Sequence, residues 1–404
     1  MNPNLDLLKP YPFERLNSLL AGITPDTGLE LLPLSLGEPK HQAPAFLVDI
    51  YQSREGIEKS FGTYPPTRGL PELRQAIAAF VNRRFNLDAN PIDPETQVLP
   101  VNGTREALFA VAQALIDNNG NTTTLMPNPF YQIYEGAAIL AGSRPVYVPC
   151  TADTDFNPDF SAVQPEDWRA CSMLYLCSPG NPTGAVMDKT CMQELIGLSD
   201  KYNFVIVSDE CYSEIYADES CPPVGLLQAA CDMGRTDYKN CLAFNSLSKR
   251  SNLPGLRSGY ATGDATLIDQ YLLYRTYHGS AMPVHNQIVS AAAWQDEEHV
   301  IANREIYRQK FDAVFDILTN VWPMPRPQAS FYLWPETPVD DQLFTRKLFS
   351  EANIKVVPGS FLARGPDNEN PGRNRVRMAL VATLDECVEA ANRIKEFMQH
   401  QKYR

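Results

Sequence analysis

The first third of the chain contains two segments whose apolar residues recur with the period of an α-helix. Residues 71–84 place Leu73 and Ile77 on one face, with Pro71 at a first-turn position that a helix tolerates. Residues 104–116 repeat the pattern directly after the apolar run VLPV and a glycine turn. We therefore expect a helix over each segment and a short strand in front of the second one.

Short apolar runs in the middle of the chain are too brief for helices and end in polar residues. They cover residues 172–177, 203–210 and 241–249, and a helical pattern separates the first two. Alternating strands and helices are typical of a parallel sheet that is buried on both faces. Because parallel strands place their carboxyl ends at one edge, we expect the functional residues there.

The pattern changes beyond residue 290, where helical stretches bracket short strands. The expected helices are 299–319, 341–352 and 385–400, and the expected strands lie near 329–334, 354–357 and 374–380. We interpret this part as a smaller α+β domain, made of residues 1–47 and 291–404, beside a large domain of residues 48–290.

The composition is that of an ordinary globular protein, and its charge is acidic. Hydrophobic residues make up 44% of the 404 residues, and 48 Asp and Glu outnumber 35 Lys and Arg to give a net charge of −13. A field of that sign disfavours nucleic acids and anionic membranes as partners. An anionic small molecule would therefore need local Arg, Lys or backbone donors.

The nine cysteines and five histidines form no Cys-x-x-Cys pair and no His-Glu-x-x-His group. This predicts reduced thiols, no disulfide framework and no metal site. The N-terminal residues lack the basic start and apolar run of a signal peptide, and no window approaches the length of a membrane span. We therefore expect a soluble cytoplasmic protein.

The segment SLSKRSNLPGLRSG, residues 246–259, follows a predicted strand. Ser246, Ser248 and Arg257 are donors suited to a cofactor phosphate, and Lys249 is an amine that can form a Schiff base. The alternative is a solvated basic turn.

Two further strand ends carry polar groups. Asp209 ends an apolar strand, where a carboxylate is costly unless a cation such as a protonated pyridine nitrogen pairs with it. Tyr212 would bring a phenol to the same edge, and the loop CSPGNPTG aims Asn181 at a fixed point. The alternatives are an exposed strand-terminal Asp and a simple turn.

Gly103, Thr104 and Arg105 open the second predicted helix, whose free N–H groups favour a phosphate, although Thr104 could be an ordinary N-cap. Tyr131 could stack on a planar ring or pack in the core. Arg377 lies two residues after another arginine on a predicted strand, which indicates a carboxylate fork or an exposed edge strand.

Taken in order, these motifs resemble those of the fold type I pyridoxal-phosphate enzymes, specifically the class I and II aminotransferases. The resemblance runs from SLGEP (35–39) and TYPPTRGLPELR (63–74) through NPTG, SDExY and SLSK to VRMALVAT (376–383). It implies a mostly parallel seven-stranded sheet flanked by helices, a smaller α+β domain and pyridoxal 5′-phosphate as cofactor. It also implies a homodimer with shared active sites.

The resemblance assigns a role to each matching residue. Lys249 would bind the cofactor covalently and move the proton of the substrate α-carbon, Asp209 would pair with the ring nitrogen, and Tyr131 would stack on the ring. Asn181 and Tyr212 would hydrogen-bond the ring hydroxyl, and Asn181 would also contact substrate. The implied phosphate ligands are Gly103, Thr104, Arg105, Ser246, Ser248, Arg257 and Tyr64 of the neighbouring subunit, and the implied ligands of the substrate α-carboxylate are Arg377 and the backbone of Gly37.

Within this class the chain is most similar to the bacterial succinyldiaminopimelate aminotransferases of lysine biosynthesis, on stretches such as YRTYHGSAM (274–282) and PGSFLAR (358–364). The implied reaction interconverts N-succinyl-LL-2,6-diaminopimelate plus 2-oxoglutarate with N-succinyl-2-amino-6-oxopimelate plus glutamate. The distal carboxylates of these substrates need donors, for which Arg275, His278 and Arg68 are candidates. A structural ion pair is the alternative for each.

Three other functions remain open at this point. The chain could be another class I aminotransferase, acting on aspartate, alanine or aromatic amino acids, or a C–S lyase with the same fold and the same lysine. A ligand sensor of this fold should carry a DNA-binding extension, which the sequence lacks. The presence of Lys249, Asp209 and Arg377 also favours catalysis.

Overall fold

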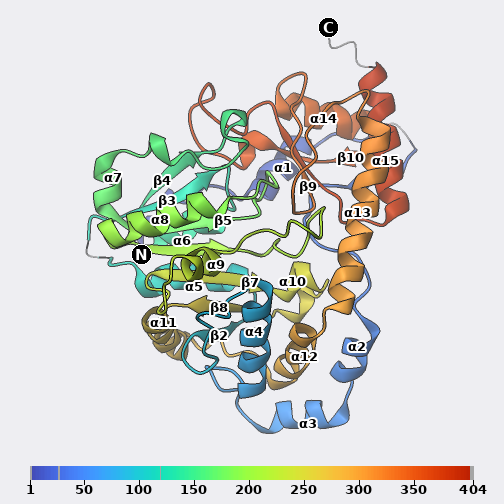
Figure 1. The fold of residues 1–404 in the computed structure, drawn as a ribbon. Helices are drawn as coiled ribbons and strands as arrows, with labels where there is room; N and C mark the ends of the chain where they lie inside the picture. The colour runs from blue at the N-terminus through green and yellow to red at the C-terminus, as the bar shows by residue number, and fades with distance from the viewer. Residues whose placement is uncertain (1, 26–27, 119, 401–404) are drawn as a thin grey trace.

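A seven-stranded sheet forms the centre of the molecule in the computed structural model, which describes residues 2–25, 28–118 and 120–400 (Figure 1). Its strands lie in the order β2-β8-β7-β6-β5-β3-β4. Their bounds are β2 (Val98–Val101), β3 (Thr123–Asn128), β4 (Arg144–Pro149), β5 (Cys171–Cys177), β6 (Val205–Asp209), β7 (Cys241–Ser246) and β8 (Gly259–Gly263). Only β8 runs against its neighbours β2 and β7, so the prediction of a mostly parallel seven-stranded sheet is confirmed.

Helices cover both faces of this sheet, as the apolar runs predict. One face packs against α4 (Pro71–Arg84), α8 (Lys189–Tyr202), α9 (Leu226–Asp232) and α12 (Val284–Gln295), and the other against α5 (Thr104–Leu115), α6 (Ile133–Leu140) and α11 (Ala265–His278). Successive strand residues alternate between the faces: Leu174 packs in the first layer and Tyr175 in the second. The helices predicted over 71–84 and 104–116 are therefore confirmed.

The C-terminal part forms a separate core around a three-stranded antiparallel sheet, β11 (Val357–Pro358), β12 (Val376–Ala379) and β9 (Tyr332–Leu333). Three helices pack around it: α13 (Glu298–Leu318), α14 (Asp341–Ala352) and α15 (Leu384–His400). The predicted helices agree within one residue at either end, whereas the strands are shorter than expected. The domain boundaries at residues 48 and 290 stay a prediction.

The N-terminal residues contribute to both parts of the molecule. Strand β1 (Leu32–Pro33) pairs with β10 (Ile354–Lys355), and α1 (Pro12–Leu20) packs on α14 and β11. Helices α2 (Ala45–Tyr51) and α3 (Arg54–Gly62) pack on α12 at the other end (Figure 1). The remaining short helices are η1 (Pro3–Leu7), η2 (Ala152–Thr154), η3 (Phe160–Ala162), α7 (Pro165–Ala170), α10 (Leu247–Arg250), η4 (Pro254–Leu256) and η5 (Gly359–Phe361).

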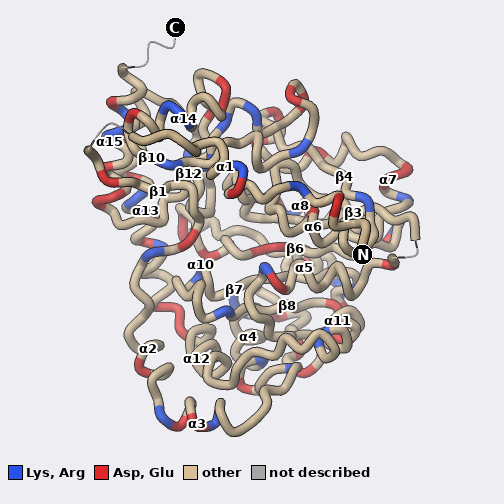
Figure 2. Tube along the Cα trace, turned by 180° about the vertical axis from the view of Figure 1, so that it is seen from behind, with Lys and Arg blue, Asp and Glu red and all other residues tan. Residues whose placement is uncertain are grey.

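Acidic and basic residues are interspersed along the chain rather than gathered in one tract (Figure 2). In the described part of the chain, no helix has both the length and the apolar character that crossing a membrane requires.

A buried ion-pair network connects the two halves of the molecule. Glu214 is only 3% exposed, and its carboxylate accepts a hydrogen bond of 2.7 Å from Arg84 Nε on α4. Arg304 on α13 lies 3.7 Å from the same carboxylate and donates to the Glu214 carbonyl at 2.9 Å. Removing the negative charge would leave two buried guanidinium groups without their shared partner.

We expect Glu214→Gln to lower the free energy of unfolding by about 3 kcal/mol, because it breaks a buried pair. Glu58→Gln is the matched control, since Glu58 pairs with Arg54 in solvent and should change stability by less than about 1 kcal/mol. Urea denaturation of both variants measures the difference. Equal losses would show that the buried network stabilises the fold no more than an exposed ion pair does.

Candidate active site

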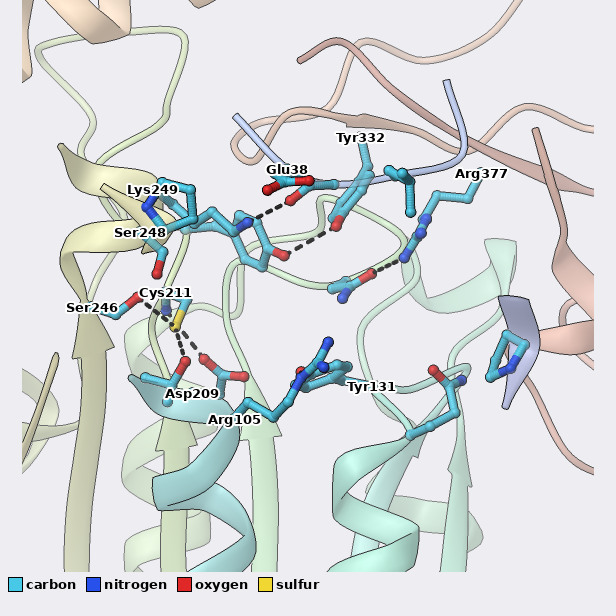
Figure 3. Close-up of a pocket in the computed structure, with 18 of the residues that line it drawn as sticks. Glu38, Arg105, Tyr131, Asp209, Cys211, Ser246, Ser248, Lys249, Tyr332 and Arg377 are labelled. Atoms are coloured by element: carbon cyan, nitrogen blue, oxygen red, sulfur yellow. Dashed lines mark hydrogen bonds between the residues drawn. The ribbon is translucent and has the colours of Figure 1, made fainter. Parts of the chain in front are cut away.

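A cavity of about 650 Å³ lies between the carboxyl ends of the parallel strands and the C-terminal sheet (Figure 3). Asp209 ends β6, Ser246 ends β7, and Asn181 lies in the loop after β5. Helix α5 follows β2 and begins at Thr104. The parallel direction of these strands therefore brings together residues that lie far apart in the sequence.

Lys249 projects into the cavity from the short helix α10 (Figure 3). Its Nζ donates a hydrogen bond of 2.5 Å to the carbonyl of Gly37. Burial lowers the pKa of this amine from 10.5 to about 8, and the positive charges of Arg377 and Arg105 act in the same direction. A lysine in this environment can give up its proton near neutral pH.

Asp209 is a buried carboxylate, so the exposed alternative is wrong. Its exposed fraction is 4%, and it accepts hydrogen bonds from the Tyr134 hydroxyl at 2.7 Å and from the Cys211 N–H at 3.3 Å. Burial raises the pKa of Asp209, and these hydrogen bonds oppose that shift. The site therefore favours a cationic partner for this carboxylate.

Hydroxyl groups gather at one end of the cavity. Ser246 and Ser248 lie at this end (Figure 3), and Thr104 and Arg257 also line the cavity. The Cys211 thiol lies between two of these hydroxyls, 3.0 Å from Thr104 Oγ1 and 3.8 Å from Ser246 Oγ. Neutral donors, one guanidinium and the start of a helix together make this end suited to an anion.

Gly103 allows the guanidinium of Arg257 to lie against the start of α5. Gly103 adopts a φ of 83°, and a Cβ atom there would be 2.5 Å from the nearer Arg257 nitrogen. That guanidinium is held by the carbonyls of Pro254 at 2.8 Å and Asn102 at 3.2 Å. A larger residue at position 103 would displace the cation from the anion site.

Arg105 directs its side chain away from the hydroxyl groups. Its Nε donates a hydrogen bond of 2.8 Å to the hydroxyl of Tyr131 (Figure 3). The Tyr131 ring packs edge-on against Tyr134 at 5.7 Å and faces the cavity. The backbone of Arg105 lies near the anion end. The terminal nitrogens of its guanidinium are directed away from that end.

Arg377 lies on β12, the central strand of the small sheet, so the alternative of an exposed edge strand is wrong. It donates to Asn181 Oδ1 at 3.1 Å and to the Ser35 carbonyl at 2.8 Å. Its Nε has no partner among the described residues. Arg377 is therefore fixed in the cavity with a donor to spare.

Tyr332 connects the two sides of the site. Its ring lies 4.6 Å from the guanidinium carbon of Arg377, and its hydroxyl is 3.2 Å from that of Tyr212. A Cβ atom on Gly37 would come within 2.0 Å of the same hydroxyl. Position 37 therefore needs a glycine for the segment to pass so close to Tyr332.

The structure thus brings eleven of the predicted site residues to the cavity wall besides Lys249. These are Gly37, Thr104, Arg105, Tyr131, Asn181, Asp209, Tyr212, Ser246, Ser248, Arg257 and Arg377. Gly103 lies directly behind Arg257. Tyr64 is 97% exposed and lies outside the cavity of its own chain.

The three candidates for a distal carboxylate are not among the described residues that line this cavity. Arg275 is fully buried, and its guanidinium pairs with Glu106 at 2.5 Å. Arg68 is held by Asp269, and His278 contacts Ser280 at the end of α11. The structural ion pair given as the alternative is present for Arg275 and Arg68, whereas His278 has a hydrogen-bonding contact with Ser280.

Several residues of the site were missed from the sequence. Tyr134 follows Tyr131 by one helical turn, and Cys211 lies within the SDECY motif, so both had a sequence signal. Glu38 lies within the SLGEP motif but was assigned no role, and Tyr332 carried no sequence signal. The N-terminal residues 11–13 also line the cavity, because α1 packs on the C-terminal part.

Comparison with known proteins places this chain among aminotransferases. The family model described as Aminotransferase class I and II matches residues 30–394. The LL-diaminopimelate aminotransferase of Desulforudis audaxviator is 29% identical over 393 residues, which are 96% of this chain and 95% of that protein. The crystal structure of an aminotransferase from Neisseria meningitidis has a TM-score of 0.92 at 48% identity and covers 97% of this chain and 98% of its own. A probable N-succinyldiaminopimelate aminotransferase from Thermus thermophilus has a TM-score of 0.83 at 26% identity, over 96% of this chain and 100% of its own.

We expect Lys249→Met to stabilise the ligand-free protein at neutral pH. The folded-state pKa of Lys249, about 8, lies below its ordinary value of 10.5, so folding is penalised below pH 8 and the penalty disappears as pH rises through 10.5. The gain should be at most about 3 kcal/mol near pH 7 and smaller near pH 10, by urea denaturation. Lys59→Met, at an exposed lysine, is the control and should show no such gain. A gain of equal size at both pH values would show that packing, rather than charge, is responsible.

Proposed function

Because the chain belongs to the class I and II aminotransferase family, whose members depend on pyridoxal 5′-phosphate, we propose that it transfers the amino group of N-succinyl-LL-2,6-diaminopimelate to 2-oxoglutarate. The products are N-succinyl-2-amino-6-oxopimelate and glutamate, and the reaction belongs to bacterial lysine and diaminopimelate biosynthesis. The names of the Desulforudis and Thermus relatives support a diaminopimelate substrate. The observation that carries the proposal is a cavity whose wall includes Lys249, the buried carboxylate of Asp209 and three arginines.

The residues of the cavity fit pyridoxal 5′-phosphate. Ser246, Ser248 and Arg257, with the free N–H groups of Thr104 and Arg105 at the start of α5, provide donors for the phosphate. Asp209 is a buried carboxylate that a protonated ring nitrogen would neutralise. When bound, the cofactor supplies an electron sink for the substrate α-carbon and carries the amino group between the two substrates.

The remaining polar residues would orient the cofactor. Asn181 and Tyr212, which line the cavity, would hydrogen-bond the ring hydroxyl, and Tyr131 would stack on the ring. The hydrogen bond from Tyr134 keeps Asp209 in position, and the bond from Arg105 does the same for Tyr131. Each orienting group is therefore itself held by a neighbour.

Lys249 moves the proton in this mechanism. With a pKa of about 8, its Nζ is partly neutral at physiological pH and can take the proton from the substrate α-carbon. The carbonyl of Gly37 accepts a hydrogen bond from Nζ and so directs the amine across the cavity. The same amine would then deliver that proton to the cofactor carbon that receives the amino group, rather than back to the substrate α-carbon.

Arg377 would bind the α-carboxylate of either substrate. Asn181 and Ser35 hold its two terminal nitrogens, so the guanidinium plane is fixed before the substrate arrives. The backbone of Gly37 provides a further contact. This contact places the substrate α-carbon close to Lys249, because Gly37 also binds Nζ.

Arg105 would bind the distal carboxylate. Four cations line the cavity: Lys249 and Arg377 are needed for the α-amino acid end, and Arg257 is needed for the phosphate. Arg105 is exposed to the cavity and uses only its Nε on Tyr131, as far as the described residues show. Its two terminal nitrogens can therefore bind a carboxylate of glutamate or of the succinylated substrate.

LL-diaminopimelate without the succinyl group is the second candidate substrate. It is favoured by the name of the curated relatives that match this chain over most of its length. This compound carries a distal ammonium group, which the exposed carboxylate of Glu38 on the cavity wall would suit. At the far end, the free compound carries an ammonium group beside a carboxylate, whereas the succinylated compound has an amide in place of the ammonium and an additional carboxylate.

We also propose that the protein is a homodimer with shared active sites. Tyr64 is almost fully exposed and does not reach the cavity of its own chain, which suits a contact with the cofactor phosphate of a neighbouring subunit.

Assays with cofactor-loaded protein test the substrate. With 2-oxoglutarate as acceptor, we expect N-succinyl-LL-2,6-diaminopimelate to give the highest kcat/KM among the succinylated and free diaminopimelates, aspartate, alanine and phenylalanine, measured by glutamate release. A preference for the free compound would transfer the assignment to the second candidate. Preference for a common amino acid, or pyruvate release without an acceptor, would overturn both, and Lys249→Ala provides the blank.

We expect Arg105→Gln to raise KM for the succinylated substrate about 10- to 100-fold, because a charge-assisted pair of hydrogen bonds is lost. With alanine, which has no distal carboxylate, kcat/KM should change much less. Arg144→Gln is the control, since Arg144 pairs with Asp167 at an exposed position away from the cavity. Equal losses with both substrates would show that Arg105 acts only through Tyr131 or the phosphate.

A further inference from the structure

The segment of residues 34–41 crosses the cavity and carries Gly37 and Glu38 (Figure 3). Its beginning is fixed to β12, where the Leu34 carbonyl accepts a hydrogen bond of 2.7 Å from the Ala379 N–H. Between this point and α2 the segment has no regular structure. The position of Gly37 over Lys249 therefore depends on what holds the far end, which is His41.

His41 is the middle of a chain of hydrogen bonds from α13. Its Nε2 lies 2.5 Å from Lys310 Nζ, and its Nδ1 lies 2.8 Å from Asn303 Oδ1. Asn303 in turn donates from Nδ2 to the carbonyl of Lys249 at 3.2 Å and to that of Arg250 at 3.3 Å. This chain of hydrogen bonds therefore connects the segment of residues 34–41 to the backbone of Lys249.

The protonation state of His41 follows from its partners. A lysine ammonium can only donate, so Nε2 must be the acceptor and the ring proton must lie on Nδ1, where it is donated to Asn303. Asn252 also donates to that amide oxygen, at 2.6 Å, so Asn303 Oδ1 accepts from two sides. This arrangement requires a neutral His41.

Two of the three side chains in this hydrogen-bond chain are buried, and His41 is half-buried. Lys310 has no exposed surface and Asn303 is 5% exposed. The Tyr307 ring packs against His41 at 4.7 Å and lies 5.1 Å from Lys310 Nζ, which excludes water from one side of the contact. Losing His41 as an acceptor would leave a buried ammonium without its short contact.

We propose that His41 and Lys310 are positioning residues, which hold Gly37 and Glu38 over Lys249 only while the imidazole of His41 is neutral. The inference goes beyond the proposed substrate but rests on the proposed binding of the substrate α-carboxylate by Arg377 and Gly37. Protonation of His41 removes its acceptor and places a second positive charge against Lys310. The segment then loses its attachment to α13. Substrate binding is therefore weakened more than the catalytic step.

The pKa shifts of His41 and Lys310 agree with this pH-dependent contact. Burial and the charge of Lys310 both lower the pKa of His41 from its ordinary 6.5, so the neutral form prevails at physiological pH. Burial also lowers the pKa of Lys310 to about 8, while Cys387 and Glu386 of α15 act in the opposite direction. Lys40 is the other cation close to Glu386. The hydrogen-bond chain is therefore intact at neutral pH and is lost in acid.

Hydrogen exchange on the cofactor-loaded protein tests the chain without any substrate. In His41→Leu we expect the amides of residues 34–41 to lose protection by about tenfold or more at neutral pH. His41→Gln can still accept and donate, so it should keep most of the protection. The matched control is His285→Leu, which also removes two hydrogen bonds, to Tyr51 and Ser60, but lies on α12.

Kinetics with any amino donor that the wild type turns over give the second measurement. We expect His41→Leu to raise KM about tenfold with kcat changed less than about threefold, because positioning rather than proton transfer is affected. For the wild type, substrate binding should weaken as the pH falls. Lys310→Met should move this acid limb of the pH profile to higher pH, since removing a neighbouring cation raises the pKa of His41.

Unchanged protection and KM in His41→Leu would overturn the proposal, as would a His41→Gln variant that is impaired as strongly as His41→Leu. An acid limb that stays in place in Lys310→Met would exclude the role of Lys310. Failure of the proposed substrate leaves the exchange experiment unaffected, so the two failures can be told apart.

Discussion

The parallel direction of β2, β3, β5, β6 and β7 is the constraint on which the rest of the site depends. Because these strands end at one edge, each delivers its polar residues to the same cavity. The apolar strand interiors are buried by helices on both faces, so they cannot shift without exposing the core. The rigid sheet thereby fixes the anion end, Asp209 and Lys249 relative to one another.

The cavity is lined by cations, although the protein as a whole is acidic. The chain carries a net charge of −13, yet four cations line the cavity, and burial together with the charges of Arg377 and Arg105 lowers the pKa of Lys249. Gathering like charges is costly unless anions are bound. The substrates proposed here and the cofactor phosphate all carry negatively charged groups. Their binding would offset the repulsion between these cations.

The N-terminal segment and the C-terminal sheet complete the site, part of which is formed by the large sheet. Gly37 binds Lys249, Ser35 binds Arg377, and Asn303 binds the backbone of Lys249. The partners in these contacts lie 212, 342 and 54 residues apart in the sequence, respectively. Because single hydrogen bonds contribute little each, the position of the segment over the cavity depends on several of them acting together.

The sequence by itself determined the fold class, the helices and the cofactor-binding motifs, because apolar periodicity and strand-end residues are local properties that survive without knowledge of distant neighbours. Only the tertiary structure decided which cations face the cavity. Arg275 is neutralised by Glu106, which lies 169 residues earlier in the chain, and Arg105 is turned by Tyr131. The direction of a charged side chain depends on partners brought close by folding, and no local pattern records them.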